Sequence, residues 1–307
     1  MANKRDLLSV TELTVEEVSE ILDLGKSLKK DKAKYSEALK GKSMGLIFQK
    51  PSNRTRVSFE IGMVQLGGYA LYLGPSEIGM GGRESVKDVA KVLSRYLDVL
   101  VARTYKHEDI EDLAKHATVP VINGLSDFAH PCQALSDIFT IKEKFGTFKG
   151  ITLSYIGDAN NVLNSLMCAA GKVGLNIKVA TPEGYQPLKK AADTAKKCAA
   201  AAGSKIEFTH DPKVAAKDAD IIYTDVWVSM GQEKEAKKRM KDFKGFQVND
   251  GIMKLTNKNC LVMHCLPAHR GDEITESVID SKNSVVYDQA ENRMHIQKAI
   301  LLSLIHI

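Results

Sequence analysis

The stretch SMGLIFQKPSNRTRVSFE, residues 43–60, passes from an apolar run through a polar turn into a segment with helical periodicity. The run at 43–48 has the length and side chains of a buried β-strand. Pro51 ends this run, and Ser52 is a residue that commonly caps the first turn of a helix. We therefore expect a strand that leads directly into a helix, which is the repeating step of an α/β fold.

The same step recurs along the chain. Segments with helical periodicity separate most of the apolar runs, as at 15–30, 84–96 and 187–203. The further runs that we expect to form strands are 70–74, 98–104, 119–125, 151–157, 176–182, 205–211, 220–227 and 261–267. This alternation predicts two α/β domains, each a mainly parallel sheet flanked by helices.

The length of 307 residues also suits two domains, each with its own core. The segment EKFGTFKG, residues 143–150, has the Gly and Lys content of a connection between domains. We place the first domain at 1–146 and the second at 147–290. The remaining residues, 291–307, form most of a last apolar helix that no strand follows.

The composition excludes several classes of protein. The net charge is +5, and the Lys-rich segment 234–245 alternates with acidic and apolar residues, so we expect no nucleic-acid binding. The five cysteines form no CxxC pair, which argues against a disulfide scaffold. No apolar run is long enough for a membrane span, and the N-terminus has no secretion signal. We expect a cytoplasmic protein.

Polar clusters follow most of the expected strands. They are PSNRTR at 51–56, Arg103, HPCQ at 130–133, GDANN at 157–161, DVWVSMG at 225–231 and HCLPAHR at 264–270. Ligands of open parallel sheets bind beyond the carboxyl ends of the strands. Because the clusters gather at these ends and not at the amino ends, they predict binding sites.

The clusters of the first half suit an anion beside a carbonyl group. A helix that starts after Ser52 offers free N–H groups, and Arg54 adds a planar fork for two phosphate oxygens. The alternative is an ordinary capped turn, with Arg54 and Arg56 paired to acids such as Glu60. Arg103 follows a buried run and therefore needs a partner or a ligand. His130 and Gln133 lie three residues apart at an expected helix start, where both could contact a carbonyl oxygen.

The clusters of the second half suit an amino acid. GDANN lacks the second glycine of a dinucleotide fingerprint, because Ala159 stands there, which disfavours a nicotinamide enzyme. Paired amides at 160–161 suit a carboxylate, and Asp225 suits an ammonium group. The segment HCLPAHR could bind zinc or hold a Cys–His nucleophile, but its spacing matches no zinc pattern, so we expect no metal.

Taken together, SNRTR, ARTY, HPCQALSD, GDANNV, DVWVSMGQE, HCLPAHRGDE and ENRMHIQKA resemble the aspartate/ornithine carbamoyltransferase family, in the family's order over nearly the whole chain. DVWVSMG and HCLPAHRG are similar to its ornithine-specific members. The resemblance implies that a carbamoyl group passes from carbamoyl phosphate to L-ornithine, giving L-citrulline and phosphate. It also implies no metal or organic cofactor, a homotrimer or a multiple of it, and a last helix that packs back on the first domain.

The resemblance assigns roles to individual residues. It implies that Arg103, His130 and Cys265 are catalytic. The carbamoyl phosphate site would consist of Ser52, Asn53, Arg54, Thr55, Arg103, His130, Gln133, Cys265, Leu266 and Arg293. The ornithine site would consist of Asn161, Asp225, Ser229 and Met230.

The chain departs from the family pattern at two positions. Asn53 replaces a threonine hydroxyl, although its amide can still donate. Gly79 replaces a glutamine that in the family reaches carbamoyl phosphate from a neighbouring subunit. Glu77, Arg83 or a backbone N–H would have to substitute for it. Alternatives are transfer to aspartate, N-modified ornithine or putrescine, or a non-catalytic binding relative, but Asp225 disfavours a dicarboxylate acceptor.

Overall fold

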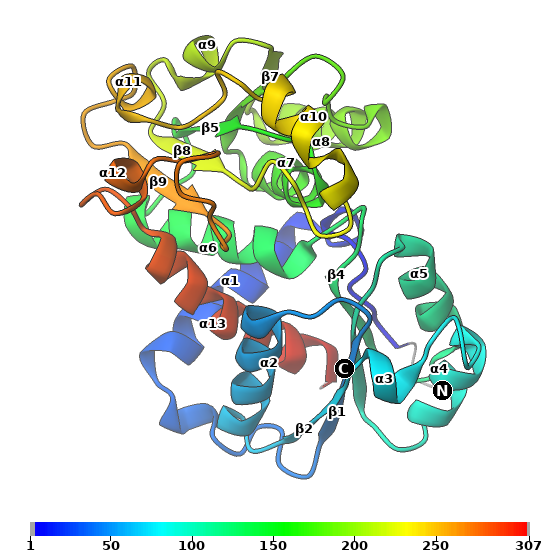
Figure 1. Cartoon of the computed structure of the whole chain (residues 1–307). Helices are drawn as coiled ribbons and strands as arrows, with labels where there is room; N and C mark the ends of the chain where they lie inside the picture. Colours follow the sequence, from blue (N-terminus) through cyan, green and yellow to red (C-terminus); the bar gives the residue numbers. More distant parts are fainter. Residues whose placement is uncertain (1–3, 306–307) are drawn as a thin grey trace. The chain divides into compact units, whose positions relative to one another are not determined.

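The computed structural model describes residues 4–305 and consists of alternating strands and helices (Figure 1). The strands are β1 (Ser43–Phe48), β2 (Tyr69–Leu73), β3 (Val99–Arg103), β4 (Val121–Leu125), β5 (Thr152–Ile156), β6 (Asn176–Ala180), β7 (Ile206–Thr209), β8 (Ile221–Thr224) and β9 (Leu261–His264). Eight of them lie within the runs predicted from the sequence, and β2 begins one residue before its predicted run at 70–74, so the nine predicted strands are confirmed.

The helices fill the intervals between the strands. They are α1 (Val15–Lys30), α2 (Asn53–Gln65), α3 (Pro75–Ile78), α4 (Val86–Leu93), α5 (His107–His116), α6 (Pro131–Phe145), α7 (Asn161–Val173), α8 (Lys189–Ala202), α9 (Pro212–Ala216), α10 (Ala236–Asp242), α11 (Asp250–Met253), α12 (Glu276–Ile279) and α13 (Val286–Ile305). Short 3-10 helices are η1 (Val10–Glu12), η2 (Ala33–Tyr35) and η3 (Glu233–Glu235). Within residues 4–305 no helix is both long and apolar enough to span a bilayer.

The chain forms two compact units. The first consists of Met1–Phe139 and Glu291–Ile307, and the second of Thr140–Ala290. The first holds a four-stranded sheet in the order β2-β1-β3-β4, and the second a five-stranded sheet in the order β7-β6-β5-β8-β9. The strands within each sheet pair in parallel, as their separation by helices requires. The predicted fold class is confirmed.

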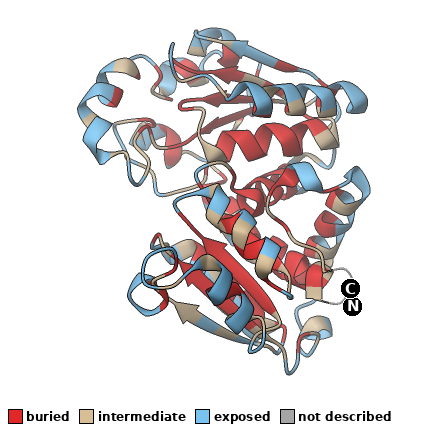
Figure 2. Ribbon diagram, turned by 90° about the vertical axis from the view of Figure 1, so that its right-hand side faces the viewer, coloured by how far each residue is buried: buried red, intermediate tan, exposed pale blue. Residues whose placement is uncertain are grey.

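The strands carry the buried core of each unit (Figure 2). All five residues of β3 are buried, which is typical of a central parallel strand covered on both faces. In the second unit, separate apolar clusters involve the faces of the sheet, one with α7 and α8 and the other with α9, α11 and α12. The edge strands β2 and β7 are the exceptions, because Tyr69 and Leu71 of β2 and Phe208 of β7 are exposed.

The last helix belongs mainly to the first unit, as predicted. Gly25 of α1 leaves the space that the side chain of Ile296 occupies, and Lys298 donates to Gln65 of α2 across 2.9 Å. Lys29 of α1 donates to Asn292. The helix begins at Val286, ahead of the predicted segment 291–307, and its first residues lie in the second unit.

Candidate active site

In each sheet the order in which the chain adds strands reverses at one point, and polar clusters lie at the strand ends beside that point. In the first unit the chain winds outward from β1 on one side and from β3 on the other, and in the second unit from β5 and from β8. Such switch points are where open α/β sheets bind ligands. PSNRTR follows β1, Arg103 ends β3, GDANN follows β5 and DVW follows β8. The topology therefore pairs up clusters that lie far apart in the sequence.

The start of α2 has the geometry of an anion site. Ser52 caps the helix, since its hydroxyl accepts from the Thr55 backbone N–H at 3.2 Å and donates to the Thr55 hydroxyl at 3.0 Å. The half-buried Arg54 side chain has no hydrogen-bond or ion-pair partner among residues 4–305. Arg56 instead pairs with Glu60 at 3.1 Å and stacks on Tyr72. The capped-turn alternative is thus correct for Arg56 and incorrect for Arg54.

Two further arginines converge on the hydroxyl of Thr55. Arg293 of α13 donates to Thr55 Oγ1 at 2.9 Å, and Arg103 at the end of β3 donates to the same atom at 3.5 Å. All three side chains are buried. Phe48 and Arg103 are opposite each other in the register of β1 and β3, so the turn after β1 lies beside Arg103. The helix start therefore faces two buried positive charges.

His130 and Gln133 add a second type of group to this cluster. His130 is buried just before α6, and burial lowers the pKa of its ring well below the ordinary value, with smaller contributions in the same direction from the charges of Arg293 and Arg103. His130 is therefore a neutral imidazole at pH 7. Gln133 donates to Asp137 at 2.8 Å, and its carbonyl oxygen is buried without a hydrogen-bond partner in the described part of the chain.

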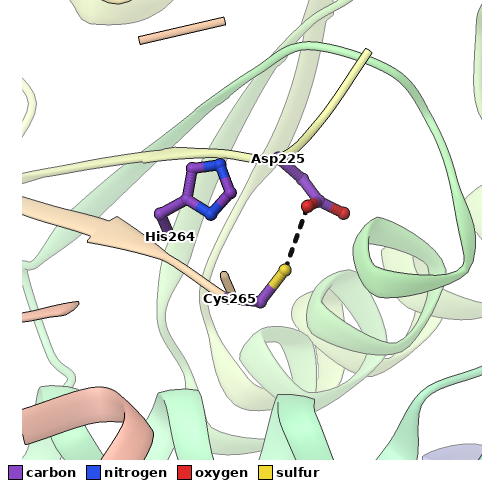
Figure 3. A group of neighbouring side chains, drawn as sticks. All are labelled: Asp225, His264 and Cys265. Carbon is purple, nitrogen blue, oxygen red and sulfur yellow. Dashed lines mark hydrogen bonds between the residues drawn. The ribbon is translucent and has the colours of Figure 1, made fainter. Parts of the chain in front are cut away.

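In the second unit, the carboxylate of Asp225 lies at the centre of the cluster (Figure 3). One of its oxygens accepts from the Asn160 amide at 2.7 Å, and the other accepts from the Cys265 thiol at 3.0 Å and from the Val226 N–H at 2.8 Å. The Asn160 oxygen also caps α7 through the N–H groups of Val162 and Leu163. Asp225 is thus fixed by both neighbouring strand ends and remains an acceptor.

The other predicted residues of this cluster come from the same two loops. Asn161 is the first residue of α7 and is half-buried. The half-buried Ser229 is fixed through its backbone N–H, which donates to the side chain of Gln232 at 3.0 Å. Met230 is exposed beside it. Leu266 follows Cys265 and has a positive φ of 58°, an uncommon conformation for a branched side chain.

Sequence reasoning missed the ion pair that supports this cluster. Arg239 of α10 donates to Asp158 at 2.8 Å and to the backbone oxygen of Trp227 at 3.0 Å. Both ion-pair side chains are buried. Burial raises the pKa of Asp158, and Arg239 partly opposes this shift. The only signal in the sequence was an arginine within a Lys-rich helix, which by itself indicates a solvated face.

The hydrogen bonds of His264 join it to Glu273 and Leu266 and not to Cys265. Its Nε2 donates to Glu273 at 3.0 Å, and its Nδ1 accepts from the Leu266 N–H at 2.9 Å. The two side chains are fully buried. The donor atoms of Asp225, His264 and Cys265 lie within 4.8 Å of one another, as metal ligands would, but hydrogen bonds already engage them. The thiol of Cys265 pairs with a carboxylate, so the geometry does not support a Cys–His nucleophile.

The loop at 79–83 lies on the same unit as the anion site. Gly79 has a φ of +54°, and a Cβ atom there would lie 2.9 Å from the Cβ of Arg83. The exposed Arg83 guanidinium donates to the backbone oxygen of Glu77. A side chain at 79 would therefore be strained by the backbone and would collide with Arg83. This explains why the glutamine of the family pattern is incompatible with this loop conformation.

Each α/β unit has a parallel sheet with polar groups at its switch point. The first unit has a buried cluster of positive charges, and the second has a cluster of carboxylate and amide groups. These features define an enzyme that acts on an anionic substrate and an amino-acid substrate. The chain matches the model of the aspartate/ornithine carbamoyltransferase carbamoyl-P binding domain at residues 5–143 and that of the Asp/Orn binding domain at residues 149–304. It therefore belongs to the aspartate/ornithine carbamoyltransferase family.

The similarity extends over nearly the full length of individual relatives. The chain is 56% identical over 299 residues to the anabolic ornithine carbamoyltransferase of Pyrococcus furiosus, covering 97% of this chain and 95% of that protein. A solved structure of the Pyrococcus furiosus ornithine carbamoyltransferase superimposes with a TM-score of 0.94 over 98% of this chain and 96% of that one. The Thermus thermophilus enzyme does so with a TM-score of 0.88 at 47% identity, covering 98% of both chains.

Proposed function

We propose that this chain is an ornithine carbamoyltransferase, which transfers the carbamoyl group of carbamoyl phosphate to the side-chain amine of L-ornithine and releases L-citrulline and phosphate. The convergence of Arg293 and Arg103 on the buried Thr55 hydroxyl at a helix start carries this proposal, because it suits a doubly charged phosphate next to a polar carbonyl group. The anabolic relative supports a role in arginine biosynthesis.

The first unit would bind carbamoyl phosphate. The phosphate would lie at the start of α2, held by Ser52, Asn53, Arg54 and Thr55. The neutral ring of His130 has one N–H to donate to the carbamoyl oxygen, and Arg103 would add a charged donor. The unpartnered oxygen of Gln133 would accept from the carbamoyl amide, which is the one substrate group with N–H donors at that end.

The second unit would bind ornithine. Asp225 and Ser229 would hold the α-amino group, Asn161 the carboxylate, and Met230 the aliphatic chain. Asp225 already accepts hydrogen bonds from both neighbouring loops, so its carboxylate is fixed where the ammonium would bind. Cys265 and Leu266 would contact the carbamoyl group. An aspartate acceptor would place a second carboxylate near Asp225, which like-charge repulsion disfavours.

The reaction needs a neutral amine and a stabilised oxyanion. An alkyl amine titrates near pH ~10, so its deprotonation at pH 7 costs roughly 4–5 kcal/mol. The neutral amine attacks the carbonyl carbon, the C–O bond to phosphate breaks, and the leaving phosphate takes up the proton that the amine loses. Arg103 and His130 would stabilise the negative charge that develops on the carbonyl oxygen. One such donor is typically worth about 3 kcal/mol.

An assay for the carbamoylated product of each acceptor, which is citrulline for ornithine, tests the proposal directly. Purified protein is mixed with carbamoyl phosphate and one acceptor at a time: ornithine, N-acetylornithine, putrescine or aspartate. We expect the highest kcat/KM with ornithine. A higher kcat/KM with another acceptor would reassign the substrate, and the absence of product with all four would make the chain a non-catalytic relative.

We also propose that the enzyme assembles as a homotrimer or a multiple of it. An exposed apolar patch supports self-association: Val57, Ile61 and Val64 lie at helical spacing on α2, and Tyr69 and Leu71 lie on the adjoining edge strand β2. Single exposed apolar residues are ordinary, but several on one helix and on the edge strand that it contacts favour an interface. The mass in solution, compared for the native protein and the Ile61→Asp variant, tests this assignment.

The domain division and the location of the protein are further proposals. The first family model ends at 143 and the second begins at 149, which supports a boundary between a carbamoyl-phosphate domain at 1–146 and an ornithine domain at 147–290. The second model runs on to 304, but the compact units place 291–307 with the first domain. The compact units divide slightly earlier, within α6. All five cysteines are free, which supports a reducing cytoplasmic location.

A further inference from the structure

Helices α7 and α8 pack side by side and unusually closely on one face of the second sheet (Figure 1). Gly171 of α7 makes this approach possible. A Cβ atom at Gly171 would lie 2.8 Å from the backbone oxygen of Ala195 and 3.0 Å from the backbone nitrogen of Ala199, both on α8. Any larger residue would push the two helices apart. The backbones are therefore near enough for short side chains to bridge them.

Two thiols meet at this contact. Cys168 lies one helical turn before Gly171, and the Cβ of Cys198 lies 3.1 Å from where the Cβ of residue 171 would be. The thiol of Cys198 is near enough to Cys168 to raise the pKa of the Cys168 thiol. A disulfide joins Cα atoms about 4.4–6.8 Å apart, and the tight helix contact supplies this kind of approach. Neither cysteine has a place in the proposed catalytic chemistry.

We propose that Cys168 and Cys198 form an oxidation site, which a small-molecule disulfide converts into a disulfide bond between α7 and α8. Cys198 is the more exposed of the two and reacts first. Its thiolate attacks one sulfur of the small disulfide, RSSR, to give a mixed disulfide and one thiolate leaving group. Cys168 then attacks the Cys198 sulfur and displaces the second leaving group. The two thiols lose two electrons and two protons, and RSSR becomes two RSH.

The surroundings of Cys168 set the order of these steps. Burial raises the pKa of Cys168 to about 12, and the neighbouring Cys198 acts in the same direction, while Lys172 opposes it. Little Cys168 is therefore thiolate at neutral pH, and it cannot be the first attacking group. Once Cys198 carries the leaving group, however, its sulfur is held against Cys168. In a reducing compartment the pair remains as two thiols until an oxidant accumulates.

Peptide mapping tests the proposal. The folded protein is incubated with oxidised glutathione at about pH 8.5, where cysteine thiolates begin to form, and is then alkylated and cleaved with trypsin. We expect residues 150–172 and 198–205 to be recovered as one disulfide-linked pair of peptides. The pair should be absent from Cys168→Ser and Cys198→Ser and present in Cys260→Ser, which removes another buried cysteine.

Two results would overturn the proposal. One is a glutathione adduct that persists on Cys198 while Cys168 remains alkylated. The other is recovery of both cysteines as alkylated thiols. A second measurement is thermal unfolding, because a bond that closes a loop of about thirty residues restricts the unfolded chain. The oxidised native protein and oxidised Cys260→Ser should melt several degrees above their reduced forms, and Cys198→Ser should show no such difference.

Discussion

The hydroxyl of Thr55 accepts a hydrogen bond of 2.9 Å from Arg293, a residue 238 positions further along the chain. This contact joins the start of α2 to the last helix and places both beside the end of β3. It brings two buried guanidinium groups, those of Arg293 and Arg103, to the start of α2, and positive charges at a helix start suit an anion.

Removal of Arg103 should nearly abolish turnover. We expect Arg103→Ala to lower kcat by about 10²–10³-fold, the usual loss for one donor to a developing oxyanion. The matched control is Arg56→Ala, because Arg56 is an arginine of the same region that is already paired with Glu60. Citrulline formation and thermal unfolding are measured for both. Near-native turnover by a folded Arg103→Ala protein would remove this residue from the mechanism.

Substitution of Asn161 and of Asp225 should affect the two acceptors, ornithine and putrescine, differently. Native protein should prefer ornithine over putrescine, which lacks the carboxylate, by about 10–100-fold in kcat/KM, since unpaired polar groups cost about 1–3 kcal/mol. Asn161→Ala should narrow this ratio by slowing ornithine alone. Asp225→Asn should slow both acceptors, because both carry the second amine. Equal rates of the native protein with ornithine and putrescine would contradict the assignment of ornithine as the acceptor.

The buried pair of Arg239 and Asp158 should matter for stability. Arg239→Met leaves a buried carboxylate without its cation, which typically costs about 3–5 kcal/mol. Denaturant unfolding of Arg239→Met, Asp158→Asn and the double variant measures the coupling. We expect the double variant to be more stable than Arg239→Met. If the two single losses simply add, the ion pair contributes nothing specific.

The neutral state of His130 predicts a pH dependence of stability. The pKa of His130 is lowered in the folded protein, so below about pH 6.5 the unfolded chain binds a proton that the folded chain does not. The contribution is fully present above that pH and is lost as the pH falls. When the pH is lowered from about 7.5 to about 5.5, the melting temperature of His130→Gln should therefore fall by less than that of the native protein. The variant His116→Gln, at a partly buried histidine beside Asp112, serves as control. An unchanged slope in His130→Gln would contradict the prediction.

The loop at 79–83 should act on the site of a neighbouring subunit. Arg54→Ala is one inactive parent, and Arg83→Ala with Gly81 and Gly82 also changed is the other. Each homotrimer damages every site, but a mixed trimer retains one interface with both parts intact. Activity of reassociated mixtures well above either parent supports sharing.

Two results would count against a shared site. Full activity of the loop variant alone would exclude the loop from the site. If both parents are inactive and verified hybrids remain inactive as well, each site is built within one chain.

The sequence by itself determined the strands, the helix starts and the kinds of groups at the strand ends. Strand-to-helix switches such as the one at Pro51 and Ser52 depend on local backbone preferences, which a single segment displays. The order of motifs likewise placed most of the groups that suit an anion in the first half of the chain and those that suit an amino acid in the second half. The sequence showed that Gly79 departs from the family pattern, but it did not show the reason for the departure.

Only the tertiary structure decided which of these groups have partners. Glu60 follows Arg56 after one helical turn, so this ion pair is a local pattern, whereas the approach of Arg103 and Arg293 to Thr55 is not. The pair of Arg239 and Asp158 and the contact of Cys168 with Cys198 join separate elements. Such contacts depend on how the sheet orders its strands and how closely its helices pack, and both result from burial of the whole core and not from any local pattern.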